Sequence, residues 1–273
     1  MLEINQIHNM DCLEGLKQLP DNCIDCIITS PPYWKGFEYE AYFNSYKQYL
    51  DWCDLWLKEC KRVLKQNGFF YLNVINDSEI TIRAFEMLEI AIKNMFKLHD
   101  TIIWYRYNQQ PANTDRQLTN QTEFIFMLRH TSANIKLNKK DVLDKKKHLF
   151  KTKNVSNVWE MPFNSVRSNF GKKETKSKWG HSGFPEDLPE TCLLLSTKEG
   201  DLVLDMFMGS GTTAVSCKRL NRNYIGFELS KEYVEIAQKR LSQKSLLPLT
   251  EKQEGGNGIP PTNKLVGILP KIL

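Results

Sequence analysis

Two short segments, each directly after an apolar run, carry residue types that can hold a ligand. The first, Asp205-Met-Phe-Met-Gly-Ser-Gly-Thr-Thr213, lies between an expected strand at 202–204 and an expected helix. Its glycines let a ligand approach the backbone, and the helix N-terminus attracts an anionic group. The Gly-Lys-Ser/Thr ending of NTPase phosphate loops and the third glycine of the dinucleotide fingerprint are absent, which disfavours phosphoryl transfer and nicotinamide-dependent dehydrogenation.

Glu228 ends the next expected strand, seventeen residues after Gly211. A carboxylate at that place can accept hydrogen bonds from the ribose diol of a nucleoside-containing cofactor. The alternative interpretation is a surface glutamate that caps the helix beginning after Ser230. In combination with Asp205 and the glycine loop, the position favours cofactor binding.

The second segment, Thr29-Ser-Pro-Pro-Tyr-Trp34, follows the β-branched run at 23–29. Two successive prolines stiffen the backbone and remove two amide donors, so carbonyls and side chains face the space beyond the strand. Ser30 Oγ and the Pro31 carbonyl can accept hydrogen bonds from a planar NH₂ group, and Tyr33 can stack on a base. Trp34 is a second stacking candidate, with core filling as the equal alternative.

Strands and helices alternate around both segments. Apolar spacing and turn residues predict strands at 23–29, 69–75, 101–107, 123–129, 202–207 and 224–228, and helices at 42–65, 78–96, 189–196, 212–220 and 231–242. Because parallel strands need crossover connections, this alternation predicts an α/β fold with a doubly wound, largely parallel sheet. Asn67-Gly68 is the expected end of the helix at 42–65, and Ser78 is the expected cap of the helix at 78–96.

Charge is distributed unevenly along the 273 residues. The formal net charge is +5, yet residues 129–178 hold fourteen Lys or Arg against four Asp or Glu, and the remainder is about −5. Such an asymmetry, interleaved with aromatics, predicts a module that faces phosphates. For the run Lys145, Lys146 and Lys147 alone, a solvated surface loop is the alternative.

Taken together, the Ser30-Pro-Pro-Tyr33 and Asp205–Thr213 segments resemble the motifs of DNA amino-methyltransferases that use S-adenosylmethionine. That family carries Asp/Asn/Ser-Pro-Pro-Tyr/Phe and Asp-Pro-Phe-x-Gly-Ser-Gly-Thr-Thr, and Met206 departs from its usual proline. The catalytic motif precedes the cofactor motif, as in the β group. The resemblance implies a Rossmann-like methyltransferase fold with a mixed, mostly parallel sheet, helices on both faces and a circularly permuted motif order.

The resemblance also implies roles for individual residues. The catalytic loop is Ser30, Pro31, Pro32 and Tyr33. The cofactor, S-adenosylmethionine, is surrounded by Asp205, Phe207, Gly209, Ser210, Gly211 and Thr212, with Glu228 on its ribose, Asp11 and Cys12 near adenine, and Phe184, Pro185 and Leu188 near methionine. An ordinary turn residue is the alternative for Asp11. The expected DNA contacts are Lys145, Lys146, Lys147, Arg167, Lys172 and Lys173.

The expected organisation is a catalytic half at 1–128, a basic target-recognition region at 129–180, a cofactor-binding half at 181–242 and a tail at 243–273. The expected partner is duplex DNA, whose target base swings out of the stack, together with a restriction endonuclease of the same specificity. Serine at the first motif position resembles cytosine N4 enzymes; adenine N6 is the alternative, and a non-catalytic DNA-binding protein the second. None of the seven cysteines follows proline, as cytosine carbon-5 methylation requires in its family.

Cysteine content and hydropathy disfavour three further classes of protein: disulfide-bonded, zinc-binding and membrane-spanning. An odd number of cysteines and the lack of a charged-then-apolar leader predict a reducing cytoplasm. Cys23 and Cys26 have ligand-like spacing, but a structural zinc site needs four ligands and a second close pair is missing. No apolar run approaches the roughly 20 residues that cross a bilayer.

Overall fold

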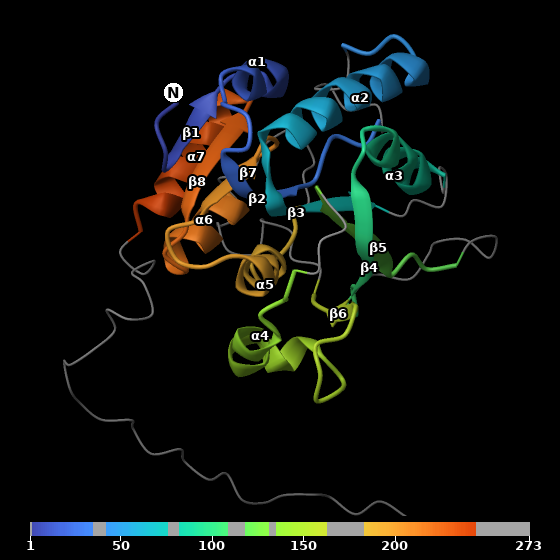
Figure 1. Cartoon of the computed structure of the whole chain (residues 1–273), viewed down its shortest axis with the longest axis vertical. Helices are drawn as coiled ribbons and strands as arrows, with labels where there is room; N and C mark the ends of the chain where they lie inside the picture. Colours follow the sequence, from blue (N-terminus) through green and yellow to red (C-terminus); the bar gives the residue numbers. More distant parts are fainter. Residues whose placement is uncertain are drawn as a thin grey trace, which may run out of the picture.

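The computed structural model describes residues 2–34, 42–75, 82–108, 118–130, 135–162 and 183–243. Eight strands form one sheet in the order β1-β8-β7-β2-β3-β5-β4-β6 (Figure 1). The strands are β1 (Gln6–Asn9), β2 (Ile24–Thr29), β3 (Leu64–Ile75), β4 (Lys97–Tyr105), β5 (Thr122–Arg129), β6 (Val158–Glu160), β7 (Leu202–Asp205) and β8 (Asn223–Glu228). Only β5 runs antiparallel to its neighbours, β3 and β4. The sheet is therefore mixed and mostly parallel, as predicted.

Seven α-helices cover the sheet within the described residues. They are α1 (Cys12–Lys17), α2 (Tyr46–Val63), α3 (Arg83–Lys93), α4 (Lys139–Lys146), α5 (Asp187–Ser196), α6 (Thr212–Arg219) and α7 (Lys231–Leu241), and a 3₁₀ turn, η2 (Lys147–Leu149), follows α4. None of these helices is long and apolar enough to cross a membrane.

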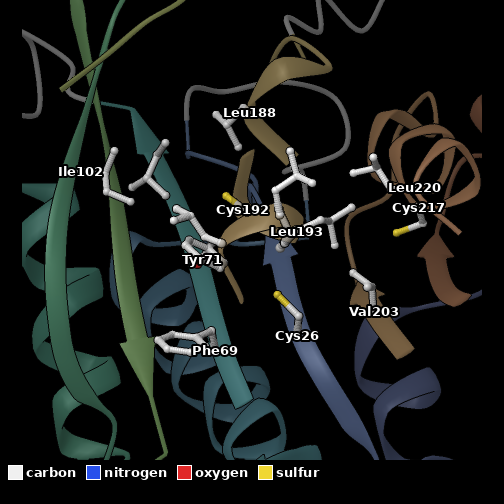
Figure 2. Packing of buried hydrophobic residues seen from close by; sticks show 14 of the residues in the cluster. Cys26, Phe69, Tyr71, Ile102, Leu188, Cys192, Leu193, Val203, Cys217 and Leu220 are labelled. Atoms are coloured by element: carbon white, nitrogen blue, oxygen red, sulfur yellow. The ribbon is translucent and has the colours of Figure 1, made fainter. Parts of the chain in front are cut away.

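The two faces of the sheet are separated by the period-2 alternation of its strands. Cys26, Tyr71 and Val203 point to the face covered by α4 to α7, where they pack with Cys192 and Cys217 (Figure 2). The intervening strand residues point to the face covered by α1, α2 and α3. Because both faces are buried, the central strands read as nearly continuous apolar runs.

Local signals explain where helix α2 begins. Ser45 accepts a hydrogen bond from the Gln48 amide and caps the helix, so it begins at Tyr46, four residues after the predicted start. The buried side of α2 includes Tyr49 and Trp56. Residues at three-to-four spacing thus form the predicted stripe.

The prediction that Asn67-Gly68 ends the helix at 42–65 was wrong. The helix, α2, ends at Val63, and both residues lie inside β3. Leu64 already pairs with Ile24 of β2. At Gly68, an added Cβ would lie 2.7 Å from the Leu64 side chain and 2.9 Å from the Asp25 carbonyl oxygen. Glycine is required there because β3 passes close to its neighbour.

Four short elements were not predicted. β1 and α1 precede the first expected strand, and α4 and β6 lie in the basic segment. β6 pairs in parallel with β4, and the Trp104 indole donates to the Met161 carbonyl oxygen at 3.1 Å. The basic segment therefore extends the common sheet, and the division of the chain at 128 and 180 stays a prediction. Ser78 and residues 244–273 lie outside the described residues.

Candidate active site

The two motif segments are adjacent because their strands are neighbours. β2 and β7 pair in parallel, with Ile27 opposite Leu204, so both end at the same edge of the sheet. β8 pairs with the other side of β7, and β1 follows it with Asn9 opposite Glu228. The segments after these four strands share one edge, where α/β sheets bind ligands.

Asp205 links the end of β2 to the glycine loop. One carboxylate oxygen accepts hydrogen bonds from the Thr29 hydroxyl at 2.6 Å and the Phe207 amide at 3.1 Å, and the other accepts from the Thr213 hydroxyl at 2.6 Å. Burial raises the pKa of this carboxyl from 3.8 to about 6, against the opposing effect of these three donors. Asp205 thus fixes the relative position of the two segments, and its contact with the cofactor stays a prediction.

The two glycines of the loop serve different needs. Both have positive φ, +52° at Gly209 and +83° at Gly211. A Cβ at Gly211 would lie 2.7 Å from the Ala237 Cβ, so the loop and α7 are in close contact there. A Cβ at Gly209 would meet only the Phe207 carbonyl oxygen, at 4.0 Å, which leaves open space beside the loop.

Glu228 lies beside this open space. Its carboxylate accepts the Gly209 amide at 2.7 Å and the Ser230 amide at 2.8 Å. Burial raises the pKa of Glu228, and these amides oppose the rise. The Ser230 hydroxyl, which accepts from the Tyr233 amide at 3.4 Å, is the side-chain cap of α7. Each carboxylate oxygen of Glu228 keeps further acceptor capacity, so a ribose diol fits this edge of the sheet.

Asp11 and Cys12 follow β1 at the same edge. Asp11 caps α1 by accepting hydrogen bonds from the Leu13 amide at 2.8 Å and the Glu14 amide at 3.3 Å. The alternative of a turn residue therefore corresponds to a helix N-cap. Cys12 is buried, and this burial raises the pKa of its thiol far above the usual range. Their proximity to adenine stays a prediction.

The apolar members of the predicted site line different elements. Phe207 lies against α2, with ring centroids 5.5 Å from Trp52 and 5.6 Å from Trp56. Met206, which replaces the proline of the motif, is buried with its sulfur 3.4 Å from the Cys60 sulfur. A longer apolar side chain therefore fills the core beneath the loop.

The remaining predicted cofactor contacts lie just before α5, at Phe184 and Pro185, and in its first turn, at Leu188. Pro185 and Leu188 are buried and Phe184 is half-buried. Leu188 lies in the apolar cluster beside Cys192 (Figure 2). Core packing accounts for Leu188, and contact of these three residues with the methionine end of a cofactor stays a prediction.

The Ser-Pro-Pro-Tyr loop is held by side chains from α2 and α3. The Tyr49 hydroxyl donates to the Pro32 carbonyl oxygen at 2.7 Å, and the Arg83 guanidinium donates to the Tyr33 carbonyl oxygen. Ser30 Oγ and the Tyr33 hydroxyl are hydrogen-bonded. The loop is thus held at the Pro32 carbonyl, at the Tyr33 carbonyl and by the hydrogen bond between the Ser30 and Tyr33 hydroxyls.

Trp34 belongs to an aromatic cluster under this loop. Its ring is 5.9 Å from Phe43 and 6.2 Å from Tyr49, centroid to centroid, and its φ is +54°. These contacts favour the core-filling interpretation over base stacking.

The three lysines at 145–147 of the basic segment differ in their exposure to solvent. Lys145 and Lys147 are exposed, as a phosphate contact requires. The Lys146 side chain is only 12% exposed; its ammonium pairs with Asp187 at 2.6 Å and also with Glu190. The prediction of a phosphate contact is therefore corrected for Lys146, which joins α4 to α5 instead. Arg167, Lys172 and Lys173 lie outside the described residues.

In the part of the chain that the structure describes, no three His, Cys, Asp or Glu side chains are grouped as metal ligands. All seven cysteines are free thiols.

The chain is similar to known DNA methylases in sequence and in fold. A family model named N6_N4_Mtase, described as DNA methylase, matches residues 24–239. The type II methyltransferase M.HinfI of Haemophilus influenzae is 32% identical over 259 residues, 88% of this chain and 69% of that protein.

Two solved structures share the fold. The cytosine-N4-specific PvuII DNA methyltransferase has a TM-score of 0.69 at 23% identity over 88% of both chains. The complex of M1.HpyAVI with SAM has a TM-score of 0.61 at 26% identity, over 87% of this chain and 99% of that one.

Fold and site thus define an S-adenosylmethionine-dependent methyltransferase. The chain belongs to the DNA methylase family, the amino-methyltransferases that its two motifs resemble.

Several residues that shape the site were not predicted. Thr29 directly precedes the first motif and Thr213 ends the second, and both donate to Asp205, while Arg83 holds the Ser-Pro-Pro-Tyr loop. Arg240 donates to Ser210 and Thr212 of the glycine loop. The threonines could have been found from their adjacency to the motifs, whereas neither arginine lies at a spacing that marks it in the sequence.

Proposed function

We propose that this protein transfers a methyl group to the exocyclic N4 nitrogen of cytosine in duplex DNA, as the modification enzyme of a type II restriction-modification system. The observation that carries the proposal is the hydrogen-bonded link from Thr29 to Asp205, which fixes Ser30 beside the glycine loop. The relatives named type II methyltransferases support the biological setting.

Hydrogen bonding within the loop leaves Ser30 able to accept. The Tyr33 hydroxyl donates to the Asn73 carbonyl oxygen at 3.4 Å, so its oxygen can take the hydrogen of Ser30. The lone pairs of Ser30 Oγ, together with the Pro31 carbonyl, then accept the two hydrogens of a base amino group. Holding both hydrogens out of the ring plane frees the nitrogen lone pair for attack.

S-adenosylmethionine, when bound, supplies an electrophilic methyl carbon on its sulfonium. Glu228, whose carboxylate accepts the Gly209 amide, is the proposed partner of the ribose hydroxyls, and Asp205 links that loop to Thr29, which directly precedes Ser30. The transfer would form a bond from the amino nitrogen to the methyl carbon as the carbon–sulfur bond breaks, and the cationic product nitrogen would then release one proton to solvent. No covalent intermediate with the protein is needed.

Adenine N6 is the second candidate target, because the matching family model covers N6 as well as N4 amino-methylases. Serine at position 30 favours cytosine. The target base must leave the duplex stack, which costs a few kcal/mol, and the ring of Tyr33 is the proposed stacking surface. Lys145 and Lys147 are the proposed phosphate contacts.

Incubation with labelled S-adenosylmethionine and diverse genomic DNA, followed by mass spectrometry of the nucleosides, tests the proposal. We expect N4-methylcytosine. Methyladenine would reject the choice of base, and no methylated nucleoside would reject the activity.

Ser30→Ala should lower kcat roughly a hundredfold, the usual effect of losing one preorganised polar contact, without changing the Kd for S-adenosylmethionine. Ser242→Ala, at the far end of α7, is the matched control. An undiminished kcat in Ser30→Ala would remove Ser30 from the mechanism.

A further inference from the structure

Arg240, near the C-terminal end of α7, is buried against the glycine loop. One guanidinium nitrogen donates to the Ser210 carbonyl oxygen at 2.7 Å, to Ser210 Oγ at 3.1 Å and to Thr212 Oγ1 at 3.2 Å. The other terminal nitrogen donates to Glu186 at 3.0 Å. A single side chain thus holds the backbone and both hydroxyls of the loop between Gly209 and Thr213.

Glu186 begins a series of alternating charges that leads away from this loop. Its other carboxylate oxygen lies 2.8 Å from Arg219 of α6. Arg219 also pairs with Glu190 of α5, and Glu190 pairs with Lys146 of α4. The series crosses α7, α6, α5 and α4, which cover one face of the sheet (Figure 1).

Burial makes the members of this series depend on one another. Side-chain exposure is 9% for Arg240, 5% for Glu190 and 12% for Lys146, and it is higher at the two members between them, 35% for Glu186 and 26% for Arg219. Removing one charge of a buried ion pair leaves the other charge desolvated and without an opposite charge, so the remaining side chain shifts toward a different charged partner. Each carboxylate here is shared by two cations, and the loss of one cation shifts the carboxylate toward the other.

We propose that Arg240 is a positioning residue for the cofactor loop, and that the charge series makes the geometry of this loop depend on Lys146 of the basic segment. The inference rests on the proposed function, because it takes residues 209–213 as the cofactor loop. Docking of α4 and binding of S-adenosylmethionine are then coupled through four helices.

The first test compares Arg240→Met with Arg240→Lys in the full chain. Lysine keeps the charge but cannot span the loop and Glu186 together. We expect the Kd and KM for S-adenosylmethionine to rise roughly tenfold in Arg240→Met, the order of one lost hydrogen bond to a charged group, and less in Arg240→Lys. The kcat at saturating cofactor should stay within about twofold of wild type, because uniform binding is removed.

The second test uses Lys146→Gln, with Lys140→Gln on the exposed side of α4 as matched control. Calorimetric titration with S-adenosylmethionine in the absence of DNA should give a Kd raised roughly threefold for Lys146→Gln and unchanged for Lys140→Gln. The Lys146→Gln/Arg240→Lys double variant should show a combined change smaller than the product of the two single changes.

A melting temperature that falls while Kd and KM of the folded fraction stay at the wild-type values would overturn the positioning role. Glu186→Gln, which keeps the side-chain volume, replaces Arg240→Met if that variant does not fold, and an unchanged Kd there has the same meaning. Multiplicative effects in the double variant would overturn the coupling. Wild-type protein that binds no S-adenosylmethionine would instead reject the proposed function.

Discussion

Asp205→Asn tests whether a charge is buried between the catalytic and cofactor loops. Asparagine keeps the shape and one acceptor oxygen, while its NH₂ group can face the oxygen of one threonine. What the substitution removes is the ionisation of a carboxyl whose pKa burial raises to about 6. We therefore expect the difference in unfolding free energy between wild type and variant to depend on pH.

The sign follows from proton binding. The folded pKa is higher than the ordinary value of 3.8, so the folded protein binds more protons than the unfolded chain between these two pH values. The contribution of Asp205 to stability is present below pH 3.8 and is lost as the pH rises through 6. At about 1.4 kcal/mol per pKa unit, the whole effect is about 3 kcal/mol, of which about 2 kcal/mol lies between pH 4 and pH 7.

Urea unfolding of wild type and Asp205→Asn at several pH values between 4 and 7 measures this difference directly. Wild type should lose about 2 kcal/mol relative to the variant over that interval. Asp54→Asn, at an exposed position on α2, is the matched control for the substitution. A difference between wild type and Asp205→Asn that is constant with pH would refute the burial of the charge.

Three other variants test the loops and the basic segment. Gly211→Ala should lower the unfolding free energy by at least about 2 kcal/mol in urea titrations, since φ is +83° and the added methyl meets α7 at 2.7 Å; an unchanged midpoint would contradict this. Arg83→Met should lower kcat/KM for DNA roughly tenfold by releasing the Tyr33 carbonyl, and a changed Kd for S-adenosylmethionine would show a wider disturbance. Lys145→Gln with Lys147→Gln should reduce the salt slope of DNA binding by up to about 2; an unchanged slope would mean a solvated surface.

Much of the sheet could be predicted from the sequence because its central strands are buried on both faces. Residues 24–29 and 202–205 are short apolar runs between turn residues, and residues 46–63 show a helical stripe. β1 escaped prediction because only Ile7 of its four residues is buried. Likewise α4 buries Val142 alone and β6 buries Trp159 alone. Such elements are stabilised by pairing or packing with a neighbouring strand or helix, and these tertiary contacts leave no periodic pattern in the sequence.

The sequence predicted which loops form the site, but it did not predict the hydrogen bonds and ion pairs that hold these loops in place. Glycines, prolines and Glu228 have local signatures, because backbone conformation and strand ends are local properties. One partner of Asp205 is not local: Thr29 lies 176 residues away along the chain. Arg240 and Glu186 are 54 residues apart. Their roles follow from strand order and helix packing, which only the folded chain brings together.

Under the prediction that the basic segment recognises the DNA target, strand β6 limits how this segment can be exchanged between related enzymes. The basic segment supplies this strand to the edge of β4, and Trp159 within it is buried. A chimera that replaces the segment without an equivalent strand would leave the backbone of β4 unpaired and an apolar site unfilled. Grafted recognition elements should therefore be joined after residue 161, or should carry their own strand with a large apolar residue at the position of Trp159.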